Sequence, residues 1–292
     1  MSDAAAPTAP TGPTTPLPPV PLRKWPRALG LMFFGWTLIG ACILSIVDAT
    51  LGMLIMPLKP AFGAWIARAW GVQLNRISLV KVETIFEAPL PEGPVIFVCN
   101  HQGNYDILAL FEGLGGVKPF VYVAKKSVFS YPFLGWFITA AKYISVDRGN
   151  REKAIASMKA AGEKIRAGQS VMIFAEGTRS ADGSVLPFKK GAFHVAMEAK
   201  VPLVPVAIEG SLQVNPKRRW YVCPNTIRIL VGPARHIADI KEDERDGVIR
   251  DVRSTVIRLH RRLGGLGGDE SQAIAASGVQ ALAIADSAGA LR

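Results

Sequence analysis

Two short segments of the sequence group residue types that can move a proton and hold an anion. The first, Asn100–Asp106 (NHQGNYD), places His101 five residues before Asp106. A continuous helix would point side chains at that spacing apart, so the two can meet only if the chain turns, and Gly103 and Asn104 are good turn residues. A carboxylate bonded to one imidazole nitrogen fixes the tautomer. We therefore predict that His101 is a general base held by Asp106.

The same histidine and aspartate allow other interpretations. A short His/Asp pair often has only a structural role, since such motifs recur freely. A metal-dependent hydrolase could use His101, Asp106 and Glu176 as ligands, but their spacing matches no recognised ligand motif, and we expect no metal. Asn104 is further expected to cap the helix that follows.

The second segment is Phe174–Ser180 (FAEGTRS), which also follows a predicted strand. Gly177 allows close backbone approach, Thr178 offers a hydroxyl, and Arg179 offers a planar fork that suits a phosphate. Together with Glu176 these residues predict an anion cradle. The alternative is an exposed turn with a solvated arginine.

Two further segments accompany this pattern, one between the two chemical segments and one after them. Tyr143–Arg148 (YISVDR) ends in a pair in which Arg148 could add a phosphate contact oriented by Asp147, or could form only a weak surface ion pair. Val201–Val206 (VPLVPV) is apolar with two prolines, which fits an edge strand, a pocket wall or, as we prefer, a core strand.

Short apolar runs alternate with amphipathic stretches from about residue 94 onward, as in an α/β domain. We predict strands at 94–99, 119–124, 171–175, 203–208 and 226–231 and helices at 107–114, 151–167 and 241–263, with a connector at 60–93. The expected fold is a mixed sheet flanked by helices. The two chemical segments would then lie at strand ends.

The segment Leu29–Leu58 is apolar apart from one charged residue, Asp48, and exceeds the roughly 18 residues that suggest a membrane helix. A straight helix of this length would run about 45 Å against a hydrocarbon core of about 30 Å. This favours a helix hairpin slightly over a tilted single span, and basic residues on both flanks fit a hairpin with both ends in the cytoplasm. The predicted divisions are a disordered Pro-rich tail at 1–22, a membrane anchor at 23–60, an α/β domain at 61–263 and an Ala/Gly-rich tail at 264–292.

The formal net charge of +11 indicates a partner that carries phosphate or another anion. Because the basic residues are interleaved with a membrane anchor, we expect an anionic membrane surface or a phosphorylated substrate and no nucleic acid. The other histidines are expected to be structural or solvated, with His236 and His260 in basic surface stretches.

In order and spacing, these segments resemble the blocks of the glycerolipid acyltransferase superfamily, and most closely the 1-acylglycerol-3-phosphate acyltransferases. The resemblance covers about residues 94–210 and extends loosely to the basic, aromatic stretch 125–136. The sequence departs from the family in having Gly103 where Ser is usual and Ala175 where Pro is usual. These departures bear on substrate preference more than on proton transfer.

The resemblance implies that His101 takes the proton of an acceptor hydroxyl, which attacks an acyl thioester. No enzyme nucleophile is needed, because the leaving thiol has a pKa of about 8.5. Backbone N–H groups near Gly103 are expected to stabilise the oxyanion. The residues expected to bind substrate are Arg148, Glu176, Gly177, Thr178 and Arg179.

The resemblance also implies 1-acylglycerol 3-phosphate as acceptor and phosphatidic acid as product. The acyl donor would be acyl-CoA or acyl carrier protein, with no other cofactor, and the enzyme would lie on the cytoplasmic face of the cell inner membrane. Two alternatives stay open: another acceptor, such as lyso-ornithine lipid or glycerol 3-phosphate, and a non-catalytic lipid-binding membrane protein.

Overall fold

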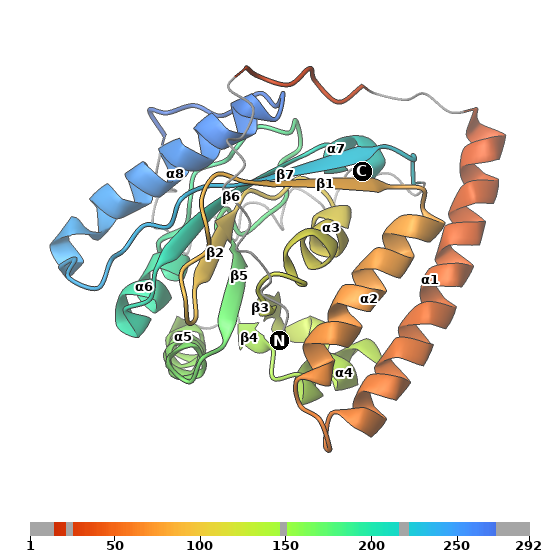
Figure 1. The fold of residues 1–292 in the computed structure, drawn as a ribbon, viewed down its shortest axis with the longest axis horizontal. Helices are drawn as coiled ribbons and strands as arrows, with labels where there is room; N and C mark the ends of the chain where they lie inside the picture. Colours follow the sequence, from red (N-terminus) through yellow and green to blue (C-terminus); the bar gives the residue numbers. More distant parts are fainter. Residues whose placement is uncertain (1–14, 22–25, 147–150, 216–221, 273–292) are drawn as a thin grey trace, which may run out of the picture.

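One mixed sheet of seven strands lies at the centre of the protein in a computed structural model, which describes residues 15–21, 26–146, 151–215 and 222–272 (Figure 1). The strand order is β1-β7-β6-β2-β5-β3-β4. All neighbours are parallel except β6 and β7, which confirms the prediction of a mixed sheet. The strands are β1 (Lys81–Phe86), β2 (Ile96–Cys99), β3 (Phe120–Lys125), β4 (Ile144–Val146), β5 (Ser170–Phe174), β6 (Leu203–Glu209) and β7 (Thr226–Val231).

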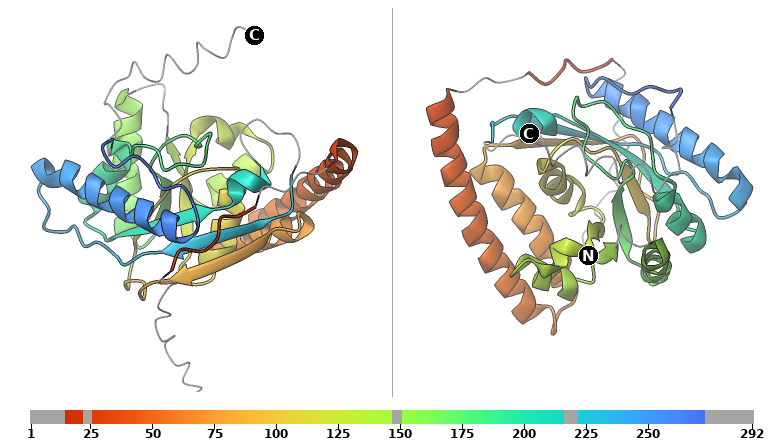
Figure 2. Two further views of the ribbon diagram at one scale, coloured as in Figure 1. Left: turned by 90° about the horizontal axis from the view of Figure 1, so that it is seen from above. Right: turned by 180° about the vertical axis from the view of Figure 1, so that it is seen from behind.

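Helices cover both faces of this sheet (Figures 1 and 2). On one face α8 packs against β6 and β7, with α6 next to it and α5 next to α6. On the other face α3 contacts β1 and β7, α2 packs outside α3, and α1 packs outside α2. The helices are α1 (Arg27–Ile55), α2 (Phe62–Ile77), α3 (Tyr105–Leu114), α4 (Leu134–Ala140), α5 (Arg151–Arg166), α6 (Lys190–Ala199), α7 (Ser211–Val214) and α8 (Arg245–Arg262), with short 3-10 helices η1 (Lys126–Ser130) and η2 (Glu242–Glu244).

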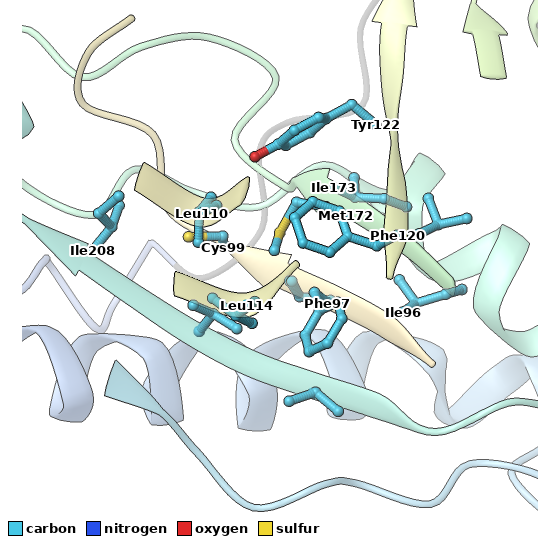
Figure 3. Close-up of a cluster of buried hydrophobic side chains, with 14 of the residues drawn as sticks. Ile96, Phe97, Cys99, Leu110, Leu114, Phe120, Tyr122, Met172, Ile173 and Ile208 are labelled. Atoms are coloured by element: carbon cyan, nitrogen blue, oxygen red, sulfur yellow. The ribbon is translucent and has the colours of Figure 1, made fainter. Parts of the chain in front are cut away.

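The central strands are buried on both faces, which explains why they are continuous apolar runs in the sequence. Figure 3 shows Phe97, Leu110 and Met172 among the buried side chains that β2, α3 and β5 contribute to the core. Pro205 lies within β6, opposite Val98 of β2. The VPLVPV segment is therefore a core strand, as preferred from the sequence, and the edge-strand alternative is wrong.

The predicted connector at 60–93 is wrong, because it contains α2 and β1. The buried face of α2 includes Gly63, Ala67 and Gly71, so its apolar stripe is weak in the sequence. Strand β1 is an edge strand whose residues are mostly half-buried, and it has no continuous apolar run. All the other predicted strands and helices are present.

The apolar segment near the N-terminus forms one unbroken helix, α1, so the hairpin favoured within residues 29–58 is wrong. The first prolines after the helix start are Pro57 and Pro60, and the chain turns there before α2 returns alongside α1. Among the described residues, α1 is the one helix long and apolar enough to cross a membrane. Its outer face exposes large apolar side chains, including Leu29, Leu31, Met32, Trp36, Leu38, Ile39, Ile43, Ile46, Val47, Leu51 and Leu54.

Residues 15–21, which we call the N-terminal strap, lie against the domain although their composition predicted disorder. The backbone N–H of Leu17 donates to the carbonyl oxygen of Arg262 (2.9 Å), and Arg228 donates to the carbonyl oxygen of Pro18 (2.6 Å). Residues 1–14 and 22 of the predicted N-terminal tail and residues 273–292 of the predicted C-terminal tail lie outside the described residues.

Candidate active site

The two predicted chemical segments lie side by side, because β2 and β5 are adjacent parallel strands whose carboxyl ends meet at one edge of the sheet. The backbone N–H of Ser180 donates to the carbonyl oxygen of His101 (2.8 Å). In return the N–H of His101 donates to Glu176 Oε1 (3.3 Å). The loops after the two strands therefore form one site.

The predicted contact between His101 and Asp106 is present, with Nδ1 and Oδ2 separated by 2.6 Å. Asp106 is completely buried, while 16% of the His101 side chain is exposed. Asp106 Oδ2 also accepts the N–H groups of Gln102 (2.7 Å) and Gly103 (3.0 Å). An oxygen that accepts from several donors places the imidazole proton on Nδ1 and leaves Nε2 to accept another. These two N–H groups are thus committed to Asp106, so neither of them is available as the oxyanion donor expected near Gly103.

The His101 ring is held on its face by an aromatic stack. It lies parallel to Phe174, with ring centroids 3.9 Å apart and an interplanar angle of 11°. Phe174 in turn stacks on Tyr122 at 5.6 Å. The stack fixes the plane of the imidazole at the end of β5.

Two asparagines of the first loop have structural roles that the sequence did not predict. The side chain of Asn100 bonds both the N–H and the carbonyl oxygen of Ile208 in β6, each at 2.9 Å. The predicted cap by Asn104 is wrong, because its backbone is already helical and its side chain makes no cap hydrogen bond. Asn104 instead donates to Asn215 (2.9 Å) and accepts a hydrogen bond from Arg179 (2.6 Å). The second bond links the loop that carries residues 176–179, here called the cradle loop, to the loop that carries His101.

The cradle loop turns at Gly177 through a backbone conformation that favours glycine. Gly177 has a positive φ of 70°, and a Cβ there would also meet the side chain of Lys189. Glu176 is buried. Burial raises the pKa of Glu176 well above its ordinary value and the charge of Asp106 adds to this effect, although the N–H groups of His101 and Leu186 oppose it. Glu176 ties the two loops together by accepting the N–H of His101.

A cavity of about 630 Å³ extends from His101 toward the helices on that side of the sheet. Its walls are mostly apolar and come from α1, α2, α3, α4 and β3, and they include Ala49, Ile66, Phe111, Val123, Phe137 and Ile138. Thr178 and three basic residues, Lys125, Arg179 and Lys189, also line it. The cavity thus combines an apolar interior with cations near the candidate general base.

The sequence analysis did not identify Lys189, the residue just before α6. Its backbone N–H donates to the carbonyl oxygen of Ala175 (2.8 Å), which lies next to Glu176. The pair Lys189-Lys190 just before a predicted helix was the signal that could have indicated it. Arg148, predicted as a second phosphate contact, lies outside the described residues together with Asp147. Within the described ranges no group of three His, Cys, Asp or Glu side chains is placed to hold a metal ion.

His260 is fully buried, so its predicted place in a basic surface stretch is wrong. It belongs to the buried face of α8, which also carries Arg253, whereas Arg250, Arg258 and Arg261 of the same helix are exposed. His260 Nε2 lies 2.6 Å from Glu209 Oε2, and Gln102 Nε2 donates to the same oxygen (2.7 Å). A buried polar cluster therefore stands directly behind the loop that carries His101.

Comparison with known proteins agrees with this geometry. Residues 80–209 match the family model described as Acyltransferase. The 1-acyl-sn-glycerol-3-phosphate acyltransferase of Saccharomyces cerevisiae is 35% identical over 54% of this chain and 54% of its own length. Chloroplastic LPAT1 of Arabidopsis thaliana, a 1-acyl-sn-glycerol-3-phosphate acyltransferase, is 31% identical over 60% of this chain and 48% of its own length. The chain thus spans about half the length of these relatives.

Two bacterial proteins are matched over more of their length. The 1-acyl-sn-glycerol-3-phosphate acyltransferase of Pseudomonas aeruginosa is 29% identical over 66% of this chain and 76% of its own length. The crystal structure of the 1-acyl-sn-glycerophosphate (LPA) acyltransferase PlsC from Thermotoga maritima shares the fold, with a TM-score of 0.66 and 22% identity over 80% of this chain and 97% of that one. The resemblance seen in the motifs is confirmed: residues 80–209 match the Acyltransferase family model, and the chain is similar to 1-acyl-sn-glycerol-3-phosphate acyltransferases of plants, yeast and bacteria.

Proposed function

We propose that this protein transfers a fatty acyl group from a thioester carrier to the sn-2 hydroxyl of 1-acylglycerol 3-phosphate, giving phosphatidic acid. The observation that carries the proposal is His101, held by Asp106 at 2.6 Å, lining a cavity that is apolar in its interior and basic near the histidine. An acyl chain suits the apolar walls. A phosphate suits the cations.

The proton moves through His101. Its Nε2 takes the proton of the acceptor hydroxyl as the oxygen attacks the thioester carbonyl, and Asp106 stabilises the imidazolium that forms. The tetrahedral intermediate then collapses, the C–S bond breaks, and the thiolate takes the proton from the imidazolium. Because a thiolate leaves readily, no serine nucleophile is needed.

The phosphate of the acceptor is placed on Arg179 and Lys189. Arg179 is fixed by its hydrogen bond to Asn104, three residues from the general base. A bidentate contact from the rest of the guanidinium would hold the hydroxyl at a set distance from His101. Thr178 and the backbone of Gly177 complete the cradle, with Glu176 holding its shape and Arg148 as an additional contact.

In this proposal, helix α1 holds the site at the membrane. Its exposed apolar face would enter the bilayer, where the lysolipid acceptor and the product reside. The positive net charge would hold the domain on anionic headgroups, at about 1 kcal/mol for each well-placed Lys or Arg. We place the protein on the inner membrane of the cell with its catalytic domain in the cytoplasm.

The test is transfer of a labelled acyl group by the purified full-length protein in detergent. Acyl-CoA and acyl carrier protein serve as donors. The acceptors are 1-acylglycerol 3-phosphate, glycerol 3-phosphate and lyso-ornithine lipid, with His101→Ala as control. Phosphatidic acid that disappears with His101→Ala supports the proposal. Product from another acceptor alone would change the acceptor and keep the chemistry, and no transfer from either donor would favour a lipid-binding role.

A further inference from the structure

Asp48 is the one charged residue in the sequence from Leu29 to Leu58, and it faces the protein interior. Only 6% of its surface is exposed, whereas the large side chains of neighbouring Ile46, Val47 and Leu51 are open. An ionisable group in a helix of this kind is costly and usually has a functional partner. The side chain of Asp48 lines the same cavity as His101.

Helices α1 and α2 face each other at this point through two polar pairs. Trp70 Nε1 donates to Ser45 Oγ (2.9 Å), and Gln73, three residues after Trp70, hydrogen-bonds to Asp48, three residues after Ser45. The first pair is complete. The second leaves both Asp48 Oδ2 and Gln73 Oε1 buried without a hydrogen-bond partner among the described residues.

A buried acceptor without a donor costs free energy that a ligand can recover. An unsubstituted acyl chain in the cavity has no donor to offer, while a chain that carries a hydroxyl has one. Other walls near Asp48, including Ala49, Ile66 and Phe137, are apolar and suit methylene groups. We infer that Asp48 forms a polar subsite in the acyl cavity that selects an acyl chain bearing a hydroxyl group, whose O–H donates to Oδ2. The inference rests on the acyl transfer proposed above.

The test compares acyl chains that differ only in a hydroxyl. Stearoyl-CoA competes with stearoyl-CoA analogues hydroxylated on carbon 3, carbon 12 or the terminal carbon, so that the carrier is the same in every case. A second arm places the hydroxyl on the acyl chain of the lysolipid acceptor. Comparing the two arms shows whether the chain that contacts Asp48 comes from the donor or from the acceptor. The readout is the ratio of kcat/KM for the hydroxylated chain to that for the plain chain.

We expect the wild-type protein to prefer one hydroxylated chain, and Asp48→Leu to lower that ratio of kcat/KM at least roughly ten-fold. Asp48→Asn keeps an acceptor oxygen and should retain part of the preference. Ser45→Ala removes the neighbouring interhelical bond and should leave the ratio unchanged. A ratio that Asp48→Leu does not alter, for every hydroxyl position and in both arms, would overturn the subsite and leave Asp48 as a contact between α1 and α2.

A binding measurement separates failure of this inference from failure of the proposed function. Non-transferable thioether analogues of the same acyl-CoAs are titrated calorimetrically into wild-type protein and Asp48→Leu. Tighter binding of a hydroxylated analogue that is lost in Asp48→Leu supports the subsite even if no acceptor is acylated. Equal binding of hydroxylated and plain analogues overturns it even if acyl transfer is observed.

Discussion

His260 donates a hydrogen bond to Glu209, and a backbone N–H group fixes the tautomer of the imidazole that makes this possible. The N–H of Gly267 donates to His260 Nδ1 (3.0 Å), so the imidazole carries its proton on Nε2, 2.6 Å from Glu209 Oε2. Burial alone would raise the pKa of Glu209, but the hydrogen bonds from His260 and Gln102 outweigh it and lower that pKa. Glu209 is therefore an ionised anchor for Gln102, whose own N–H holds Asp106.

Glu209→Gln should lower kcat while leaving both substrate KM values nearly unchanged. The loss of the anchor lets Gln102 shift, and a displacement near the general base can cost up to about 10²-fold in rate. The measurement is steady-state kinetics over a range of acceptor and donor concentrations, with circular dichroism to monitor folding. Gln213→Ala is the matched control, because Gln213 makes only a 3.3 Å bond to the other oxygen of Glu209. A variant that melts at lower temperature with unchanged kcat would show a purely structural role.

Asp106→Asn should reduce kcat by about 10²-fold to 10⁴-fold with little change in stability. The amide keeps the shape of the carboxylate but cannot stabilise the imidazolium that forms on His101. His101→Ala should remove transfer to the limit of detection. Both are measured with the labelled acyl donor. Full activity of His101→Ala would exclude His101 as the base, and full activity of Asp106→Asn would exclude stabilisation of the imidazolium by Asp106.

Arg179→Ala should raise the KM for the lysophospholipid about ten-fold or more and leave the KM for the acyl donor unchanged, because in the proposed complex the guanidinium contacts the acceptor phosphate and not the acyl donor. Arg179→Lys should recover only part of the affinity, since an ammonium cannot make the bidentate contact. Arg235→Ala, which alters an exposed arginine paired with Asp251, controls for the loss of one positive charge. An unaltered acceptor KM in Arg179→Ala would show that the phosphate binds elsewhere.

Glu176→Gln should stabilise the protein more at pH 8 than at pH 5. Because the pKa of Glu176 is raised in the folded state, the folded protein binds more protons at this site than the unfolded chain does, and stability falls as pH rises above about 4.3. Gln mimics the neutral form and removes that loss. Melting temperatures across the pH range test this, with Glu198→Gln as a partly exposed control. A difference in melting temperature that stays constant with pH would contradict it.

Much of the fold was predictable because its central strands are continuous apolar runs and its surface helices are amphipathic. Helix α2 was not predictable, since it packs on its neighbours through small residues such as Gly71, where a side chain would meet the backbone of Leu108. Strand β1 was also missed, because only its pairing with β7 identifies it as a strand.

In the candidate site, the sequence predicted what lies within one loop and missed what other elements bring to it. The contact between His101 and Asp106 depends on six consecutive residues and the turn within them. Glu209 and His260 come from β6 and α8, far along the chain, and only the fold places them behind Gln102. Gly103 shows the same limit: a side chain there would meet the carbonyl oxygen of Ser211 at 2.8 Å, which explains why this chain has no room for the serine usual in the family.

The N-terminal strap limits how far the membrane helix can move relative to the catalytic domain. Pro21 accepts a hydrogen bond from Asn225 (2.8 Å), and the five Cα–Cα steps from Pro21 to Pro26 can span at most about 18 Å. At its other end α1 turns directly into α2, which packs on α3. With both ends restrained, the helix acts as a fixed strut and not as a flexible tether, so the depth of His101 relative to the lipid headgroups would be set by the fold itself.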